Sequence, residues 1–260
     1  SKVVSIANSG KSLLTYDSMR SILENVSASI GSGGLTQSQL RDMQTLVDEL
    51  GKVSGKNNYL YGISYSLVNG NPANAYWTGG SWQSSALGNL NVGSNQNQLD
   101  HLISKWFLGG DLPSTYGGWT NGGAHVQDNK PLFSAGGTPL MSDVGQGAIG
   151  DCYFLAAAAE VAKFEPEIIK SMFTDNGNGT YGVRFYNSNM QAVYVTVNKS
   201  VYAGGAFNAP STQAASWVPL LEKAYVEYRS EFNPSYNNYN LINGGWGEGL
   251  RAITGHNVNW

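Results

Sequence analysis

The stretch that most constrains this chain is "VGQGAIGDCYFLAAAAE", residues 144–160, which contains the single cysteine, Cys152. Three glycines and Gln146 lie just upstream of Cys152, and glycines at this density allow a tight backbone path. The small apolar residues downstream have the pattern of a helix against which other elements pack closely. The sequence therefore predicts a loop that runs directly into a helix, with Asp151 as its N-cap and Cys152 in its first turn.

Composition and charge exclude several classes of function. The 260 residues suffice for one large domain or two small ones. Residues 1–130 carry eight basic and eight acidic side chains, and residues 131–260 carry seven and ten, which gives the net charge of −3. Neither half has the positive field that nucleic acid requires, and no apolar run of about 18 residues predicts a membrane span.

Charged residues make up 13% of the chain, roughly half the usual share for soluble domains. This low share favours a secreted or cell-surface bacterial protein. The chain begins with Ser1 and shows no signal-peptide pattern, which is typical of a processed or trimmed product. A single cysteine forms no intrachain disulfide, so its thiol is either buried or chemically used.

The pattern of apolar residues predicts a mainly helical α+β fold. In the first half, amphipathic helices are expected over 16–31, from the N-cap Thr36 to a stop at Gly51, and over 95–109, while 58–68 fits a helix or a strand. In the second half, helices are expected over 151–164, 165–173 and 217–232, and two strands over 180–186 and 191–197 form a hairpin. We divide the chain into a helical N-terminal region, a connecting segment and a lobe that carries the cysteine, at residues 1–110, 111–135 and 136–260.

The residues around Cys152 are those that acyl transfer needs. A helix N-terminus, a cationic histidine or both favour the thiolate, which is the nucleophilic form. The side-chain amide of Gln146 and the backbone N–H of Cys152 are candidate donors to a developing oxyanion. The competing interpretation is a buried structural cysteine, which is the usual role of a lone cysteine before an alanine-rich helix.

Three segments resemble one protein family. "QGAIGDCYFLAA" resembles the active-site cysteine motif of calpain-type proteases, a branch of the papain-like cysteine proteases. "WVPLLEKAY" (217–225) and "LINGGWGEGLRAITG" (241–255) resemble two further motifs of that family, and the predicted hairpin fits the strands between them. The resemblance covers residues 136–255 and implies the first lobe of a papain-like protease, with a small antiparallel sheet or hairpin.

The resemblance implies a role for individual residues. Cys152 matches the nucleophile that cleaves peptide bonds through a thioester acyl-enzyme, and Gln146 matches the oxyanion-hole glutamine. Gly244 and Gly245 match the glycines whose backbone pairs with the substrate peptide. Tyr153 stands where the family usually has tryptophan.

The resemblance also suggests a calcium site. Asp143 and Glu222 match two carboxylates that share a calcium ion in the calcium-regulated members, and the loop 136–138 could add carbonyl oxygens. Calcium takes about six to eight oxygen ligands, so two carboxylates alone are far short of a site. The alternatives are a turn cap for Asp143 and a salt bridge for Glu222.

The resemblance assigns no residue of this chain as the catalytic histidine or asparagine. In calpain-type enzymes both come from a second lobe further along the chain, whereas His101, His125 and His256 lack the expected order or surroundings. We therefore expect a C-terminal protease lobe to supply them, and this chain alone to be inactive. Two alternatives stay open: a pseudoenzyme or binding module, and another papain-like acyl transferase such as a transglutaminase-like enzyme.

Overall fold

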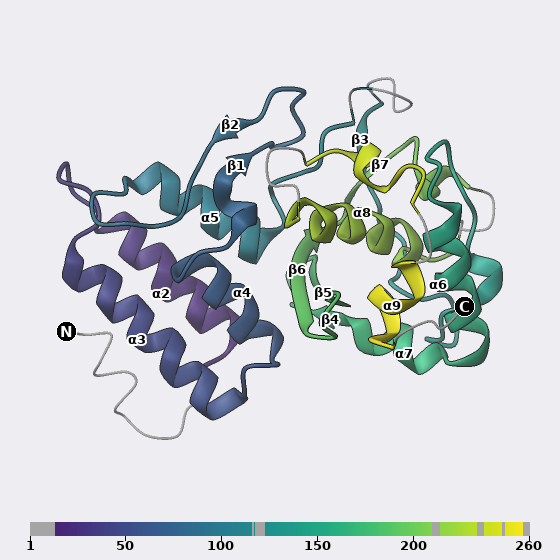
Figure 1. The fold of residues 1–260 in the computed structure, drawn as a ribbon, viewed down its shortest axis with the longest axis horizontal. Helices are drawn as coiled ribbons and strands as arrows, with labels where there is room; N and C mark the ends of the chain where they lie inside the picture. The colour runs from purple at the N-terminus through teal and green to yellow at the C-terminus, as the bar shows by residue number, and fades with distance from the viewer. Residues whose placement is uncertain are drawn as a thin grey trace.

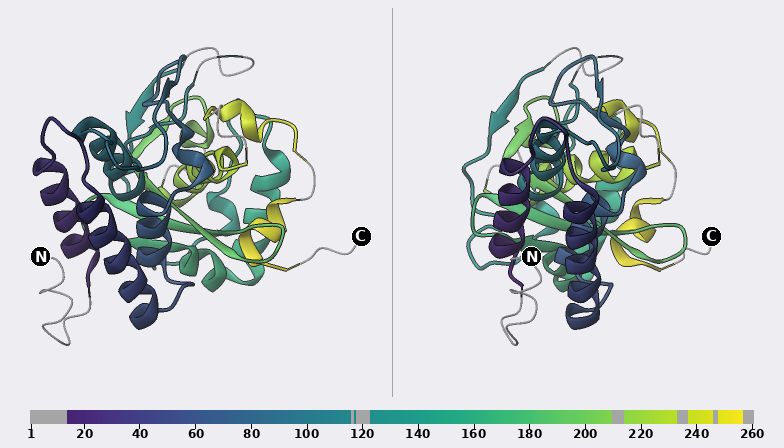
Figure 2. Two further views of the ribbon diagram at one scale, coloured as in Figure 1. Left: turned by 60° about the vertical axis from the view of Figure 1, so that its left-hand side comes forward. Right: turned by 90° about the vertical axis from the view of Figure 1, so that its left-hand side faces the viewer.

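The computed structural model describes residues 14–115, 117, 123–209, 214–232, 237–245 and 248–256. Within these residues it has eight α-helices and three small antiparallel sheets, which confirms the predicted α+β class. Helices α2–α5 gather at one end of the molecule and α6–α9 at the other, with the sheet β4–β5–β6 between them (Figure 1). In the left view of Figure 2, α2 and α3 lie on one side of the molecule and α9 on the other.

The N-terminal helices follow signals that are present in the sequence. They are α2 (Tyr16–Ala28), α3 (Gln37–Ser54), α4 (Tyr59–Val68) and α5 (Gln96–Leu108), so the ambiguous segment 58–68 is helical. The side chain of each N-cap accepts a hydrogen bond from a first-turn backbone N–H: these caps are Thr15, Thr36, Asn58 and Asn95. Such caps satisfy donors that the helix itself leaves free.

The predicted stop of α3 at Gly51 is wrong. The helix continues to Ser54 and ends at Gly55, which has a φ of 80°. Gly51 is instead a point of close packing, because a Cβ there would come within 2.5 Å of the ring of Tyr61. Glycine permits this approach between α3 and α4 at a modest cost in helix stability.

The helices of the N-terminal region enclose one hydrophobic core. Its members come mainly from the inner faces of α2–α5 and include Met19, Leu23, Met43, Leu46, Val47, Ile63, Leu67, Leu99, Leu102 and Phe107. The short helix η1 (Pro72–Ala75) and the hairpin of β1 (Tyr76–Trp77) and β2 (Ser85–Ala86) lie between α4 and α5 in the chain. The stripes predicted from the sequence thus meet in a common core.

The central sheet joins the two ends of the molecule. The predicted hairpin is confirmed as β5 (Thr180–Tyr186) and β6 (Ala192–Asn198), paired from Thr180 with Asn198 to Tyr186 with Ala192, and β4 (Phe173–Asp175) adds a third strand. On β6, Val195 and Val197 belong to the core of the second lobe. Thr196, between them, bonds to Tyr59 and to the backbone of Trp106. Successive side chains of a strand point to opposite faces, so β6 packs on the second lobe with one face and contacts the N-terminal region with the other.

The second lobe is built around α8 (Trp217–Ser230), where every residue except Arg229 is buried. Around it lie α6 (Cys152–Phe164), α7 (Pro166–Met172), α9 (Glu248–Thr254) and the short helices η2 (Met141–Asp143), η3 (Ala206–Asn208) and η5 (Tyr239–Ile242). The strands β3 (His125–Gln127) and β7 (Ser200–Tyr202) pair antiparallel, so the predicted connecting segment contributes a strand. The predicted domain boundaries themselves stay a prediction.

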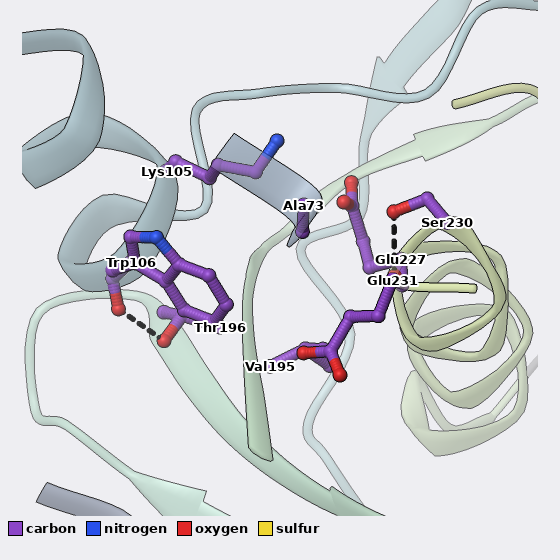
Figure 3. Close-up of a pocket in the computed structure, with 8 residues that line it drawn as sticks. All are labelled: Ala73, Lys105, Trp106, Val195, Thr196, Glu227, Ser230 and Glu231. Atoms are coloured by element: carbon purple, nitrogen blue, oxygen red, sulfur yellow. Dashed lines mark hydrogen bonds between the residues drawn. The ribbon is translucent and has the colours of Figure 1, made fainter. Parts of the chain in front are cut away.

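Buried charges link the two ends. Lys105 of α5 forms an ion pair with Asp111, and their side chains are 8% and 1% exposed. Asn237 Nδ2 donates to the Asp111 carbonyl and to Glu227 Oε2 of α8, at 3.3 Å each. Lys105 and Glu227 line the same small pocket, from opposite sides, with Glu231 beside them (Figure 3).

Among the described residues, no helix combines the length and apolar character that a membrane span requires.

Candidate active site

Cys152 is the first residue of α6, as predicted, and its side chain is exposed. The backbone N–H groups of a helix start can donate to negative charge that develops beside them. Asp151 occupies the N-cap position, but its side chain makes no capping hydrogen bond and is completely buried. The structural alternative of a buried cysteine is therefore not what the fold shows.

Asp151 turns inward to a second carboxyl group, that of Glu222 on α8. Burial raises the pKa of Asp151 to about 7. Burial and the neighbouring Asp151 raise the pKa of Glu222 as well, because two adjacent carboxylates resist ionising together. Glu222 also accepts the backbone N–H of Ala206 at 3.0 Å, so the pair connects the start of α6 with the turn 204–206.

The loop before Cys152 packs against the same turn, residues 204–206. Ala148 N donates to Gly204 O at 2.8 Å, and a Cβ on Gly147 would come within 2.1 Å of Gly205 O. Gln146 is exposed, and its Nε2 donates to Ile149 O at 2.6 Å. The predicted oxyanion donor is thus held by its own loop with one amide hydrogen left, and its role stays a prediction.

The predicted peptide-binding glycines lie beside this loop. Gly244 N donates to Gly150 O at 2.9 Å, two residues before Cys152. A Cβ on Gly245 would come within 2.2 Å of the Tyr153 ring, the residue after the cysteine. The fold therefore brings together the cysteine and the glycine pair, which are about 90 residues apart in the chain. The next two residues, 246 and 247, lie outside the described part.

Asn243 is a site residue that sequence reasoning missed. Its Oδ1 accepts the backbone N–H of Gly150 at 3.1 Å, next to the bond between Gly244 and Gly150. An asparagine before two glycines has the pattern of a turn, and nothing local indicates a partner 93 residues away. The carboxyl contact of Asp151 with Glu222 was missed for the same reason.

The carboxylates predicted to share calcium have other partners. Asp143 Oδ2 accepts Trp217 Nε1 at 2.8 Å and Leu140 N at 2.9 Å, which fits the alternative of a turn cap. Glu222 accepts a hydrogen bond from the backbone N–H of Ala206 and lies beside the carboxyl group of Asp151. Neither partner is the cationic side chain that the alternative of a salt bridge requires. No group of three or more His, Cys, Asp or Glu within the described ranges is placed to hold a metal ion. Both carboxylates thus accept hydrogen bonds from the protein itself, and the calcium assignment stays a prediction.

All three histidines lie in the described part of the chain, and the contacts found for them there are with residues other than Cys152. The ring of His101 lies 4.5 Å from that of Trp77, and His125 Nε2 bonds to Pro113 O at 2.9 Å. His256 is exposed at the end of α9. Burial lowers the pKa of His125 and so favours the neutral form of its ring. That the general base is none of the three stays a prediction.

Comparison with known proteins identifies the family. The sequence profile described as "Calpain family cysteine protease" matches residues 117–259, which is more than half of the chain. The calpain-type cysteine protease DEK1 of Zea mays is 35% identical over 137 residues, which cover 50% of this chain and 6% of the maize protein. Calpain-B of Drosophila melanogaster is 25% identical over 209 residues, 72% of this chain and 22% of the fly protein.

The calpain-2 catalytic subunit of Gallus gallus is 30% identical over 137 residues, 50% of this chain and 19% of the chicken protein. The chain thus spans less than a quarter of the length of these relatives. They come from plants and animals and lend no support to the bacterial, secreted origin that composition favoured. With its cysteine at a helix start and its glycine pair alongside, and with the family profile matched over its second half, this chain belongs to the calpain family of cysteine proteases.

Proposed function

We propose that this chain is the nucleophile-bearing portion of a cysteine endopeptidase. The observation that carries the proposal is the exposed Cys152 at the start of α6, flanked by residues that contact the Gly244–Gly245 edge. A thiol placed where an extended peptide can lie along a glycine edge suits attack on a peptide carbonyl.

In the proposed reaction, the Cys152 thiolate attacks the carbonyl carbon of the substrate. The C–N bond then breaks, the amine leaves with a proton from an imidazolium, and a thioester remains on Cys152. Water hydrolyses the thioester and regenerates the thiol. The backbone N–H of Cys152 and the amide of Gln146 are proposed to stabilise the oxyanion, which requires Gln146 to turn from Ile149.

The general base is proposed to come from a second lobe that carries histidine and asparagine. We expect no peptide hydrolysis by this chain alone, and hydrolysis once a calpain-type second lobe is added. Replacing His101, His125 and His256 together by alanine should leave that complemented activity in place. Hydrolysis by the chain alone that disappears in the triple variant would contradict this assignment.

Peptide binding can be tested without the second lobe. A peptidyl chloromethyl ketone and a small chloroketone carry the same electrophile, so the ratio of their rates with Cys152 reports what the peptide contributes. We expect the peptidyl reagent to react faster, and Cys152→Ser to abolish both reactions. Equal rates for the two reagents would contradict the proposal that this chain recognises a peptide, and would favour an acyl transferase with a different acceptor. Peptide preference without hydrolysis, even with a second lobe, would favour a pseudoenzyme.

Calcium binding at Asp143 and Glu222 stays a prediction from the family resemblance, and no step of the proposed reaction depends on it. Calorimetric titration with calcium at millimolar concentration tests it, with Asp143→Ala as the comparison. Absence of binding, or binding that is the same in the variant, would remove the assignment.

A further inference from the structure

The two-residue contact at Gly150 is the feature from which we draw a further inference. Gly150 uses both of its backbone polar groups on the glycine-pair loop: its N–H donates to Asn243 Oδ1 at 3.1 Å, and its C=O accepts Gly244 N at 2.9 Å. Two bonds in opposite directions fix both the position and the orientation of one segment against the other. This clamp lies two residues before the thiol.

The two chain segments that meet at Gly150 are closely packed there. A Cβ on Gly150 would come within 2.3 Å of Asn243 Oδ1, so a larger residue at 150 would displace the Asn243 side chain from this bond. On the other side of Cys152, Gly245 lies against the Tyr153 ring, and a Cβ on Gly249 would come within 3.0 Å of the Phe154 Cα. The loop that contains Asn243 and the start of α9 thus contact the chain on both sides of the cysteine.

Of these contacts, only the bond from Gly150 to Asn243 depends on a side chain of the loop. The backbone of Asn243 is held separately, because its N–H donates to Asn240 O at 3.2 Å at the end of η5. Loss of the Asn243 amide would leave the Gly150 N–H without its acceptor and free the loop to shift along Gly150. The turn formed by η5 would remain.

We propose that Asn243 is a positioning residue that sets the register between the peptide-binding edge at Gly244 and the Cys152 thiol. The inference rests on the proposed function, since it assumes that a peptide lies along this edge. Its consequence is specific: loss of the Asn243 acceptor should weaken the contribution of the peptide to reaction at Cys152, while the reactivity of the thiol toward a small reagent should be retained.

The test is the ratio of rate constants for a peptidyl chloromethyl ketone and a small chloroketone, measured on the full chain. Asn243→Ala should lower this ratio about tenfold, the size expected for one lost hydrogen bond that leaves a donor unpaired. The rate with the small reagent should change less than about twofold. Asn243→Asp keeps an acceptor of the same shape and should restore the ratio.

Two controls separate positioning from general damage. Asn187→Ala removes a half-buried asparagine of the β5–β6 hairpin, which bonds to Gln191, and should leave both rates unchanged. If Asn243→Ala fails to fold, Asn243→Gln offers the same amide one methylene further out and should lower the ratio. Exchange of the Gly150 amide hydrogen should be slow in the wild type and Asn243→Asp, and faster in Asn243→Gln.

The outcomes distinguish the two proposals. A wild-type ratio near one would refute peptide recognition and the Asn243 inference with it. A high wild-type ratio that Asn243→Ala retains would refute the positioning role alone. Equal losses for both reagents, or no rescue by Asn243→Asp, would show that Asn243 acts only through stability.

Discussion

Helices α3 and α8 show how differently the two ends of this molecule are stabilised. α3 buries one stripe of apolar residues and keeps its charges in solvent, where Lys52 and Glu49 are 70% and 47% exposed. α8 is buried almost all round and takes Glu222, Lys223 and Glu227 into the interior. Local signals and an apolar stripe suffice for α3, whereas α8 depends on partners that are distant in the chain.

The largest expected effect is the loss of Lys223. Its side chain is completely buried, and Nζ donates to Asn198 O, Asn198 Oδ1 and Ser200 O at 2.7–3.2 Å. Lys223→Ala should lower the free energy of unfolding by about 3–5 kcal/mol, because it leaves buried partners unsatisfied. Urea denaturation measures the change, and a loss below about 1 kcal/mol would mean that α8 does not need this anchor.

The pH dependence of stability should reveal Glu227. Burial and the charge of Asp111 raise its pKa from 4.5 to about 8 in the folded state. The folded protein then binds more protons than the unfolded chain, so this group makes the free energy of unfolding fall as the pH rises from about 4.5 toward 8.

Lys223 contributes with the opposite sign. Burial lowers its pKa to about 7, so its contribution rises with pH above about 7. The effect of Glu227 should therefore be clearest between about pH 5 and 7. Glu227→Gln should make the fall in that window less steep, while Asp151 and Glu222, whose pKa values are also raised, still contribute to it. Urea titrations at several pH values measure the slope. The same slope in wild type and variant would contradict the raised pKa.

In the N-terminal region, loss of a helix cap should have a moderate effect. Thr36 and Gln39 form a capping box at the start of α3, with Thr36 Oγ1 accepting from Gln39 N at 3.2 Å. Thr36→Ala should lower the free energy of unfolding by about 1 kcal/mol. Thr36→Ser keeps the hydroxyl and should lose much less, and equal losses in the two would exclude a capping role.

The smallest effect is expected for Lys52→Ala. Lys52 forms an ion pair with Glu49 at 2.7 Å, and both side chains are exposed. Exposed pairs on a helix are worth about 0.3–0.5 kcal/mol, so the melting temperature should hardly change. A loss close to that of Lys223→Ala would remove the contrast between the two helices.

Much of the fold could be predicted because its signals are local. The cap Thr36, the stop of α5 at Gly109 and the β5–β6 hairpin each depend on residues within a few positions of one another. The start of α6 at Cys152 was also correct, since the glycine loop and the apolar run adjoin it. Where a glycine serves distant packing, as Gly51 does against Tyr61, the local interpretation as a helix stop was wrong.

The sequence by itself determined most of the helices, the hairpin and the position of Cys152 at a helix start, and its motifs pointed to the family. It left α4 open between helix and strand and did not predict α9. Only the tertiary structure decided which distant residues meet at the cysteine: Asn243 and Gly244 at Gly150, and Glu222 at Asp151. Helix starts and turns are set by short-range hydrogen bonds and backbone preferences. Contacts across 70 to 90 residues depend on how the whole chain packs, and no local pattern encodes them.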